Sequence, residues 1–444
     1  MNRRILGLAR RASKLCLAAI LLSAALACAA RGPSTPATVD GPIATSIVGT
    51  PQVPGLDARL DALEEQVSTL RGLPRKGETK RRFLSSSELA AEIGRQLDKN
   101  DAREQIEREQ ALYRMLGLID PDTDLDRLYR ALLGSQVLGL YDPETDEFLV
   151  LENSSGDLGA LAESTYAHEF AHRLQDAQYD LEMLAKATKG NADRALALSA
   201  LIEGDATLTQ LGYGLKYMGR ARLVELMSEE RRVSPPPADI PYVMLRALEF
   251  PYQAGQRFAA ALRGSDDRFD AIDRAFLDPP LTTEQVIHVE KYLRREAAMD
   301  VQLPPDGPPG EAWTRAFEDV LGEFLLRTWL RSLGAPGADR AAAGWGGDRV
   351  AVFYGPDHRT ALAACIVWDD PETDGPEFFS ALTKGLDGAS RWRRTVDAST
   401  KGALWEDGRG AIGVRLHAGS HGVTIAAGPS ARDVSELLDW VAGR

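Results

Sequence analysis

The sequence predicts an α+β protein in which a mostly helical domain precedes a smaller domain with a mostly antiparallel sheet. Between residues 83 and 302, apolar residues mostly recur every three or four positions, which is the period of a helix that faces a core. After residues 303–310, which contain four prolines and two glycines, short apolar runs separated by turn residues become frequent. We therefore expect two domains, at 83–302 and 311–444, joined by a Pro/Gly linker at 303–310.

The helical domain is expected to contain one short β-hairpin. Residues 136–141 and 147–151 read as strands, and the Asp-Pro-Glu-Thr-Asp run between them is typical of a turn. Helices are expected at 85–97, 102–118, 125–133, 158–179, 191–211 and 242–262. One further segment spans residues 281–296. Pro251 predicts a kink or break in the sixth of these segments.

The C-terminal domain is expected to alternate helices with short strands. The predicted helices are 313–333, 371–386 and 430–441, and the predicted strands are 350–354, 362–368, 402–405, 411–416 and 422–427. The chain shows no internal repeat.

The N-terminus has the form of a signal peptide at residues 1–28. Five basic residues precede an apolar run at 15–27, which is too short to span a bilayer comfortably. The run ends in Ala-Leu-Ala followed by Cys28, which fits either ordinary cleavage or lipidation of that cysteine. We favour the lipoprotein route, because the polar stretch that follows suits a tether. The protein is then expected to be exported and membrane-anchored in the cell envelope, facing periplasm or exterior.

Composition narrows the class of partner. The formal net charge is −13, and the signal contributes five positive charges, so the mature chain is near −18. An acidic chain without a basic run after the signal argues against nucleic acid as a partner. Cys365 is the one cysteine in the body of the chain, so a large core rather than an internal disulfide must stabilise it.

Residues 29–82 are expected to connect the signal to the body. Residues 29–54 are rich in Pro, Thr, Ser and Gly and predict a flexible linker. A short heptad pattern at 56–71 follows, and it has two interpretations. It could mediate self-association, or it could be a single helix packed on the main domain, which we prefer slightly. Residues 76–82 are read as a basic hinge.

His168, Glu169 and His172 form an H-E-x-x-H motif within the helix predicted at 158–179. Four residues advance about 400° around a helix, so the two imidazoles share one face and can hold one Zn²⁺. Glu169 lies beside them, where it can act on a water without being a ligand. The alternative is a polar helix face, but the chain has only 6 histidines and the motif's flanks are mostly uncharged.

A third ligand is expected on the next helix. Glu203 stands in an Ala/Leu-rich segment, where a carboxylate is otherwise unwelcome. Gly204 beside it costs helix stability and suggests that two helices approach closely there. Asp205 is the fallback ligand, and it is also a candidate for orienting a ligand from behind. The alternative is that Glu203 and Asp205 lie on a solvated stripe.

The remaining roles are assigned by proximity in the sequence. Asp176 lies one turn after His172 and could orient a ligand histidine, or it could be an ordinary helix carboxylate paired with a neighbouring base. With zinc supplying polarisation, Glu169 would move the proton as general base in hydrolysis of a peptide bond. His288 is the first choice as donor to the oxyanion, with Tyr292 and Tyr166 as alternatives.

These residues carry a family resemblance. His168, His172 and Glu203 resemble the gluzincin-type zinc metallopeptidases, the thermolysin-like and peptidase-MA-like group, in which a glutamate on a following helix is the third ligand. That resemblance implies one Zn²⁺, a zincin-like fold at 83–302, a peptide or protein substrate, and an edge strand beside the zinc helix to which substrate can add.

A second resemblance covers residues 83–292 and one piece of the C-terminal domain. Here the chain is similar to a group of largely uncharacterised exported bacterial proteins. The matching pieces are 139–143, 168–176, 203–206, 283–288 and 345–349.

The chain also departs from the thermolysin pattern. Thirty residues separate His172 from Glu203, which is a longer gap than in many thermolysin-like enzymes, and the Asn-rich edge strand is absent. The glycine and third histidine that metzincins place soon after the motif are absent as well. Two other functions therefore stay open: a non-catalytic binding or structural lipoprotein on a zincin scaffold, and a zinc amidase acting on cell-wall peptides.

Overall fold

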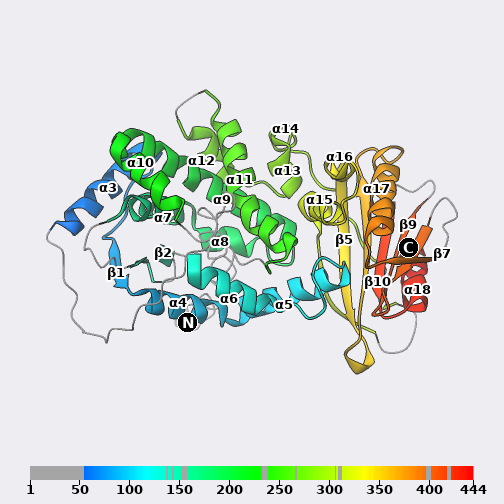
Figure 1. The fold of residues 1–444 in the computed structure, drawn as a ribbon. Helices are drawn as coiled ribbons and strands as arrows, with labels where there is room; N and C mark the ends of the chain where they lie inside the picture. Colours follow the sequence, from blue (N-terminus) through cyan, green and yellow to red (C-terminus); the bar gives the residue numbers. More distant parts are fainter. Residues whose placement is uncertain are drawn as a thin grey trace, which may run out of the picture.

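The computed structural model describes residues 55–443 except 137–138, 143–144, 152–157, 233–238, 266–267, 306, 309–312, 397–401 and 418–421. The predicted signal peptide, Cys28 and the linker at 29–54 lie outside the described residues. The described chain is an α+β protein, as predicted, with a helical part and a part built on one antiparallel sheet (Figure 1).

The helical part contains most of the helices and a three-stranded sheet. Its helices are α3 (Leu56–Arg71), α4 (Ser86–Leu97), α5 (Asn100–Met115), α6 (Leu125–Gln136), α7 (Ala160–Tyr179), α8 (Leu181–Lys186), α9 (Ala192–Tyr213), the π-helical turn η1 (Gly214–Met218), α10 (Gly219–Glu230), α11 (Tyr242–Arg263), α12 (Asp270–Leu277), α13 (Thr283–Ile287) and α14 (Val289–Leu293). Its strands are β1 (Lys80–Leu84), β2 (Gly139–Asp142) and β3 (Glu147–Leu151), in the order β1-β3-β2. Helix α11 runs through Pro251 without a break.

The predicted hairpin is confirmed, and it places β2 at the edge of the small sheet. Strands β2 and β3 pair antiparallel, with Tyr141 opposite Phe148. Strand β1 pairs parallel with β3 on its other side. Helix α7 packs against β2, so the edge strand lies beside the helix that carries the H-E-x-x-H motif.

The helix at 56–71 is part of the folded body rather than a stalk. Leu60, Leu63 and Val67 are buried in a core cluster with side chains of α7, so the apolar seam is occupied within the chain. This agrees with the preferred interpretation of a single helix packed on the main domain, and self-association stays a prediction. The expected basic hinge at 76–82 is wrong, because β1 begins at Lys80 and joins the sheet. The helical part thus starts near residue 56 rather than 83.

Helices α9 and α11 approach at backbone distance. A Cβ added at Gly204 would lie 2.2 Å from the carbonyl oxygen of Gly255, and one added at Gly255 would lie 2.0 Å from that of Ala200. Real Cβ atoms do not come so close, so both positions need glycine. The close approach expected at Gly204 is confirmed, and its partner is α11.

The C-terminal part is built on a seven-stranded antiparallel sheet with the strand order β4-β5-β6-β10-β9-β8-β7. Its elements are β4 (Thr314–Asp319), α15 (Gly322–Ser332), α16 (Ala338–Ala342), β5 (Trp345–Tyr354), the 3₁₀ turn η2 (Pro356–His358), β6 (Thr360–Trp368), α17 (Asp374–Gly388), β7 (Arg393–Val396), β8 (Gly402–Glu406), β9 (Ala411–Leu416), β10 (Gly422–Gly428) and α18 (Ala431–Ala442). Figure 1 shows α17 beside the sheet on the side of α15 and α16.

Two details of this part differ from the prediction. The helix expected at 313–333 is a strand followed by a helix, β4 and α15. The domain boundary also lies earlier than 303–310, because Val301 and Leu303 are buried in the same cluster as Phe353 of the sheet. The amide of Met299 already donates to the carbonyl of Gly346 in β5.

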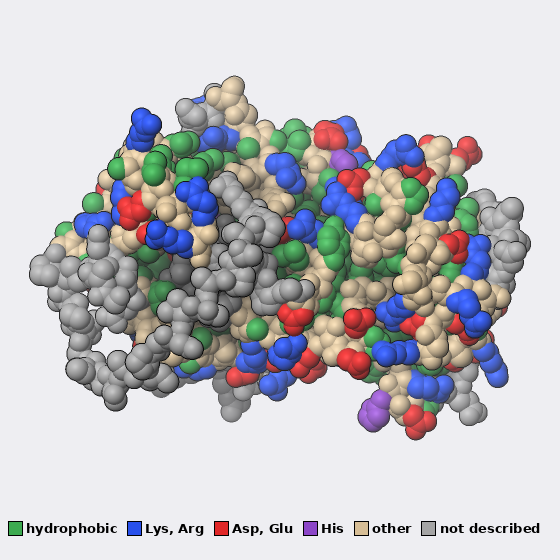
Figure 2. Space-filling view, in the orientation of Figure 1, with side chains coloured by type: hydrophobic (Ala, Val, Ile, Leu, Met, Phe, Trp, Pro, Cys, Tyr) green, Lys and Arg blue, Asp and Glu red, His purple; other side chains and the backbone are tan. Residues whose placement is uncertain are grey.

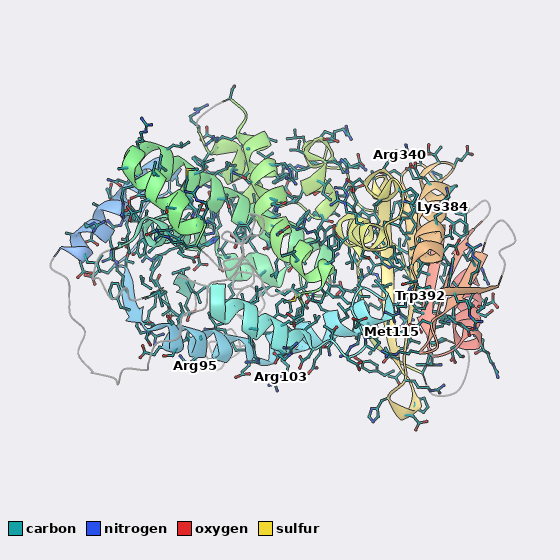
Figure 3. All side chains as sticks on the ribbon, viewed as in Figure 1. Arg95, Arg103, Met115, Arg340, Lys384 and Trp392 are labelled. Carbon is teal, nitrogen blue, oxygen red and sulfur yellow. The ribbon has the colours of Figure 1, made fainter. Side chains whose placement is uncertain are left out.

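Buried carboxylates lie at the junction of the two parts, and one of them, Asp319, bridges it. Asp319, at the end of β4, accepts from the amide of Ala192 at the start of α9, and Asp193 accepts from the amide of Thr283. Asp348 of β5 accepts from the amides of Leu321 and Gly322. Away from these carboxylates, Trp392 lies against Gly117, just after α5, and Figure 3 shows Met115 and Trp392 at this boundary. No helix among the described residues is long and apolar enough to cross a membrane.

Candidate metal centre

Helix α7 turns the H-E-x-x-H motif into the interior. His168, Glu169 and His172 are 4%, 2% and 2% exposed, and apolar Phe170 and Ala171 between them are fully buried. The whole turn is covered because α7 packs on α9 on one side and against β2 on another. A polar, titratable turn that is buried on all sides needs partners for its nitrogen and oxygen atoms.

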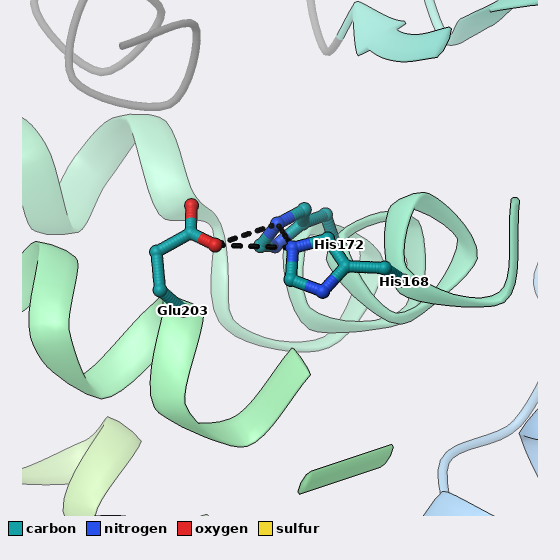
Figure 4. A group of neighbouring side chains, drawn as sticks. All are labelled: His168, His172 and Glu203. Carbon is teal, nitrogen blue, oxygen red and sulfur yellow. Dashed lines mark hydrogen bonds and ion pairs between the residues drawn. The ribbon is translucent and has the colours of Figure 1, made fainter. Parts of the chain in front are cut away.

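The third predicted ligand is brought to the two histidines. Nε2 of His168 lies 3.1 Å and Nε2 of His172 lies 3.5 Å from Oε2 of Glu203, and the two Nε2 atoms are 3.0 Å apart (Figure 4). The donor atoms of a tetrahedral zinc site, with bonds of about 2.0–2.1 Å, lie roughly 3.3–3.4 Å apart. The three atoms therefore form a group able to hold a metal ion.

Burial and charge favour a cation between these atoms. Glu203 is 1% exposed, and its Oε1 has no hydrogen-bond partner within the part of the chain that the structure describes. Burial raises the pKa of Glu203, but the His172 charge and the hydrogen bonds from both histidines lower it below its usual range. Burial alone would lower the pKa of His172, but the carboxylate raises it to about 9. The three side chains together therefore favour a positive charge between them.

Glu169 stands next to this group without joining it. Its Oε2 accepts a hydrogen bond of 3.0 Å from the backbone N–H of Tyr141 in β2. Burial raises the pKa of Glu169, and the neighbouring histidines only partly oppose the rise. A carboxylate with an elevated pKa beside a metal group can accept a proton and return it near neutral pH.

A chain of buried hydrogen bonds holds His172 from behind. Its Nδ1 lies 2.9 Å from Oε1 of Gln175, whose Nε2 donates to Asp205 at 2.8 Å. Arg71, at the end of α3, donates to Asp205 at 3.0 Å and to Asp273 at 2.7 Å. Because the far nitrogen is engaged, Nε2 of His172 keeps its lone pair directed at the ligand group. Asp205 therefore supports a ligand, as predicted, and is not itself one.

Gln175 and Arg71 were missed by the sequence reasoning. Gln175 stands three residues after His172, so helical spacing could have suggested it. Arg71 lies 134 residues before Asp205, and no local pattern connects the two.

Asp176 has a different role from the one expected. It accepts from the phenol of Tyr141 at 3.3 Å and from the amide of Leu181 at 3.2 Å. It therefore fastens β2 and the end of α7, and it orients neither ligand histidine. The neighbouring position, Gln175, does that instead.

The three candidate oxyanion donors are engaged elsewhere. His288 pairs with Glu323 of α15 at 3.0 Å, and the phenol of Tyr292 donates to the carbonyl of Asp278. Thr283, five residues before His288, contacts Asp193, and ten residues of helix, about 15 Å, separate Asp193 from Glu203. The phenol of Tyr166 donates to Glu64 of α3. Each of the three is thus bonded to a group outside the ligand set, and the donor role stays a prediction.

Tyr252 of α11 is the aromatic residue that stands beside the group. Its ring centroid is 6.0 Å from that of His168, and the residue is 7% exposed. Nothing in the local sequence marks it, because the close contact of α9 with α11 is what brings it there.

A second cluster of potential ligands lies in the same protein. Glu284, Glu296 and Asp369 also bring three carboxylates together. Here Nζ of Lys291 stands among them, 2.7 Å from Glu284 and 2.7 Å from Glu296, and it also bonds Asp369. The ammonium of Lys291 already lies at the centre of this cluster.

Comparison with known proteins adds one match. Residues 312–438, which cover most of the C-terminal part, match a family described as "Domain of unknown function (DUF8575)". Neither the curated proteins nor the solved structures gave a match.

Proposed function

We propose that this protein is a zinc-dependent peptidase whose ion is held by His168, His172 and Glu203. The observation that carries the proposal is the convergence of three buried ligand atoms, with Glu169 beside them. Two of these atoms come from histidines one turn apart on α7, and the third comes from α9. Two imidazoles and a carboxylate suit zinc among the common divalent ions, and they leave a position open for catalysis. Zinc bound there supplies Lewis acidity, which polarises a carbonyl and lowers the pKa of water.

The protein's own residues supply the proton transfer. Glu169 takes the proton from the attacking water and gives it to the departing amine. Its hydrogen bond from the Tyr141 amide fixes the carboxylate in place, so that the second oxygen is free to act. His172 is held by Gln175, and Tyr252 closes the wall next to His168.

The position of β2 favours an extended peptide as substrate. The Tyr141 amide points away from β3, toward Glu169, at the outer edge of the sheet. Alternate residues of a strand direct their hydrogen-bonding groups to the same edge, so Gly139 offers a second pair. An extended chain that adds to this edge would pass directly beside Glu169.

The test measures metal and hydrolysis together. Purified protein is expected to contain one zinc per chain and to cleave members of a quenched fluorescent peptide library. Glu169→Gln should keep the zinc and lose about 10²- to 10⁴-fold in kcat/KM. Glu182→Gln, at a surface pair on α8, is the matched control and should change neither. A Glu169→Gln protein as active as the parent would refute the mechanism, and a protein without zinc would favour a binding role.

We also propose that the protein is exported and held in the cell envelope by a lipid on Cys28. The basic start and the apolar run that ends at this cysteine support the proposal. Metabolic labelling with palmitate should mark the parent and not Cys28→Ser. Equal labelling of both would refute lipidation at this residue.

A further inference from the structure

A cavity of about 200 Å³ lies where the helical part meets the C-terminal part. Its walls are α5, α9, α11 and residues 317–325, which run from β4 into α15. The lining is mainly apolar and includes Leu112, Leu196, Leu248, Phe317 and Phe324. Figure 2 shows hydrophobic side chains gathered in the middle of the face between the two parts. A cavity of about 150 Å³ is enough to bind benzene, so this one can take a larger apolar group.

Arg108 and Lys189 also line the cavity, but three buried carboxyl groups in its wall oppose an anionic ligand. Glu109, Asp193 and Asp319 line it, and Glu109 accepts a hydrogen bond of 2.8 Å from Tyr129. Burial raises the pKa of each of these three carboxyl groups. A ligand that brings its own carboxylate would meet acidic groups that are already costly to ionise. A neutral apolar group is the chemistry that fits.

The cavity adjoins the metal centre along two helices. Ser199 lines it, and Glu203 follows one turn later on the same face of α9, about 6 Å away. Pro251 lines it too, and the next residue, Tyr252, places its ring 6.0 Å from that of His168. An extended peptide advances about 3.3 Å per residue, so a side chain within two residues of the reacting bond is near enough to enter.

We propose that this interdomain cavity binds a bulky apolar side chain of the substrate, next to the peptide bond that is cut. The inference rests on the proposed peptidase function and adds a substrate class to it. It also gives the C-terminal part a task, because Phe317, Phe324 and their neighbours form one wall of the specificity pocket.

The experiment fills the cavity from one side. Ala247 lines the cavity from α11, and Ala247→Phe places a ring in it. Ala260→Phe adds the same ring on the exposed face of the same helix and is the matched control. Ala195→Leu, a smaller filling change on α9, replaces Ala247→Phe if that variant does not fold.

Two readouts keep the inference separate from the proposed function. In a peptide library, the parent should prefer Phe, Leu or Met over Ala at one position beside the cleaved bond by about 10- to 100-fold in kcat/KM, as burial of one large side chain implies. Ala247→Phe should abolish the preference and Ala260→Phe should keep it. Cleavage without such a preference, or a preference unchanged by Ala247→Phe, overturns the pocket and leaves the peptidase intact.

The second readout does not need hydrolysis. Indole binding, followed by ligand-observed NMR, should be seen with the parent and Ala260→Phe and be lost in Ala247→Phe. That result supports the cavity as an apolar site even if no peptide is cleaved. Indole binding that is absent in the parent, or equal in all three proteins, overturns the inference.

Discussion

Two groups of three potential ligands occur among the described residues, and they differ in what lies at their centre. Glu284, Glu296 and Asp369 surround the ammonium of Lys291, and the three carboxylates range from buried to exposed. His168, His172 and Glu203 are all buried, and within the described residues no lysine or arginine is paired with them. The group around Lys291 is an ion-pair network with its own cation. In the group on α7 and α9, the lone pairs of the ligand atoms point at one another.

The contrast indicates which clusters of polar side chains are able to hold a metal ion. Clustered carboxylates alone say little, because a lysine can neutralise them. Two imidazoles within 3.0 Å of each other and 3.1–3.5 Å of a carboxylate need a shared cation or protons to be stable in a buried place.

The largest effect is expected from removing a ligand. His172→Ala should lose zinc affinity by about a thousandfold, because a ligand's share of a zinc site's 10–16 kcal/mol is roughly 4 kcal/mol. Glu296→Gln, in the Lys291 group, should not change zinc content. Titration with a competing chelator measures both. Equal losses in the two variants would mean that the groups do not differ as described.

The next effect is on stability. Arg71→Met removes the partner of buried Asp205 and should lower the free energy of unfolding by about 3 kcal/mol, because an unpaired carboxylate is left in the interior. Lys291→Met should cost less, since Asp369 and Glu296 are partly open to water. Urea denaturation of the zinc-free proteins compares them. A larger loss for Lys291→Met would reverse the assignment of the buried network.

A smaller effect on zinc affinity is expected from the residue that bonds the far ring nitrogen of His172. Gln175→Ala should weaken zinc binding about 10- to 100-fold without abolishing it, since outer partners of ligand histidines contribute that much. Asp176→Asn is the control on the same helix, and it should leave zinc affinity unchanged. If Asp176→Asn had the stronger effect, the original sequence expectation would be right after all.

The smallest effect is a pH dependence at the junction of the two parts. Burial raises the pKa of Asp348 to about 6 and that of Glu284 to about 7, and the hydrogen bond to Glu323 raises the pKa of His288. For the two acids, the folded state holds more protons than the unfolded state until the pH exceeds the folded pKa. For His288, the stabilisation is complete below its unfolded pKa and is lost above its folded pKa.

All three groups therefore stabilise the junction less as the pH rises. These groups should lower the free energy of unfolding by on the order of 1 kcal/mol between pH 6.5 and pH 8. Melting of the zinc-free protein in a series of buffers measures the slope. In His288→Gln the slope should become shallower, and a stability that rises over this interval would contradict the prediction.

The sequence was informative where chemistry depends on local spacing. His168, Glu169 and His172 follow from the period of one helix, and Glu203 stands out as an acid in an apolar segment. The hairpin before the motif was also readable, because alternating strands and a turn are local. These elements needed only the short-range rules of helices and strands.

What escaped prediction depends on contacts between distant segments. Arg71 reaches Asp205 only because α3 packs on the body, although its residues looked like part of a connector. Tyr252 reaches His168 through the Gly204–Gly255 contact. His288 was chosen as the only other histidine in its domain, but the C-terminal part supplies its partner, Glu323. Periodicity carries no information about such tertiary neighbours.

The pairing of Arg71 also dictates an order of events during synthesis. Its two partners come 134 and 202 residues later in the chain, so they leave the ribosome long after α3 does. Leu60, Leu63 and Val67 also lack the helix that covers them until α7, at Ala160–Tyr179, has been made. Contacts of such long sequence separation form late and leave apolar surface exposed in the meantime. The emerging N-terminal helix is therefore the segment of this domain that would most need a chaperone.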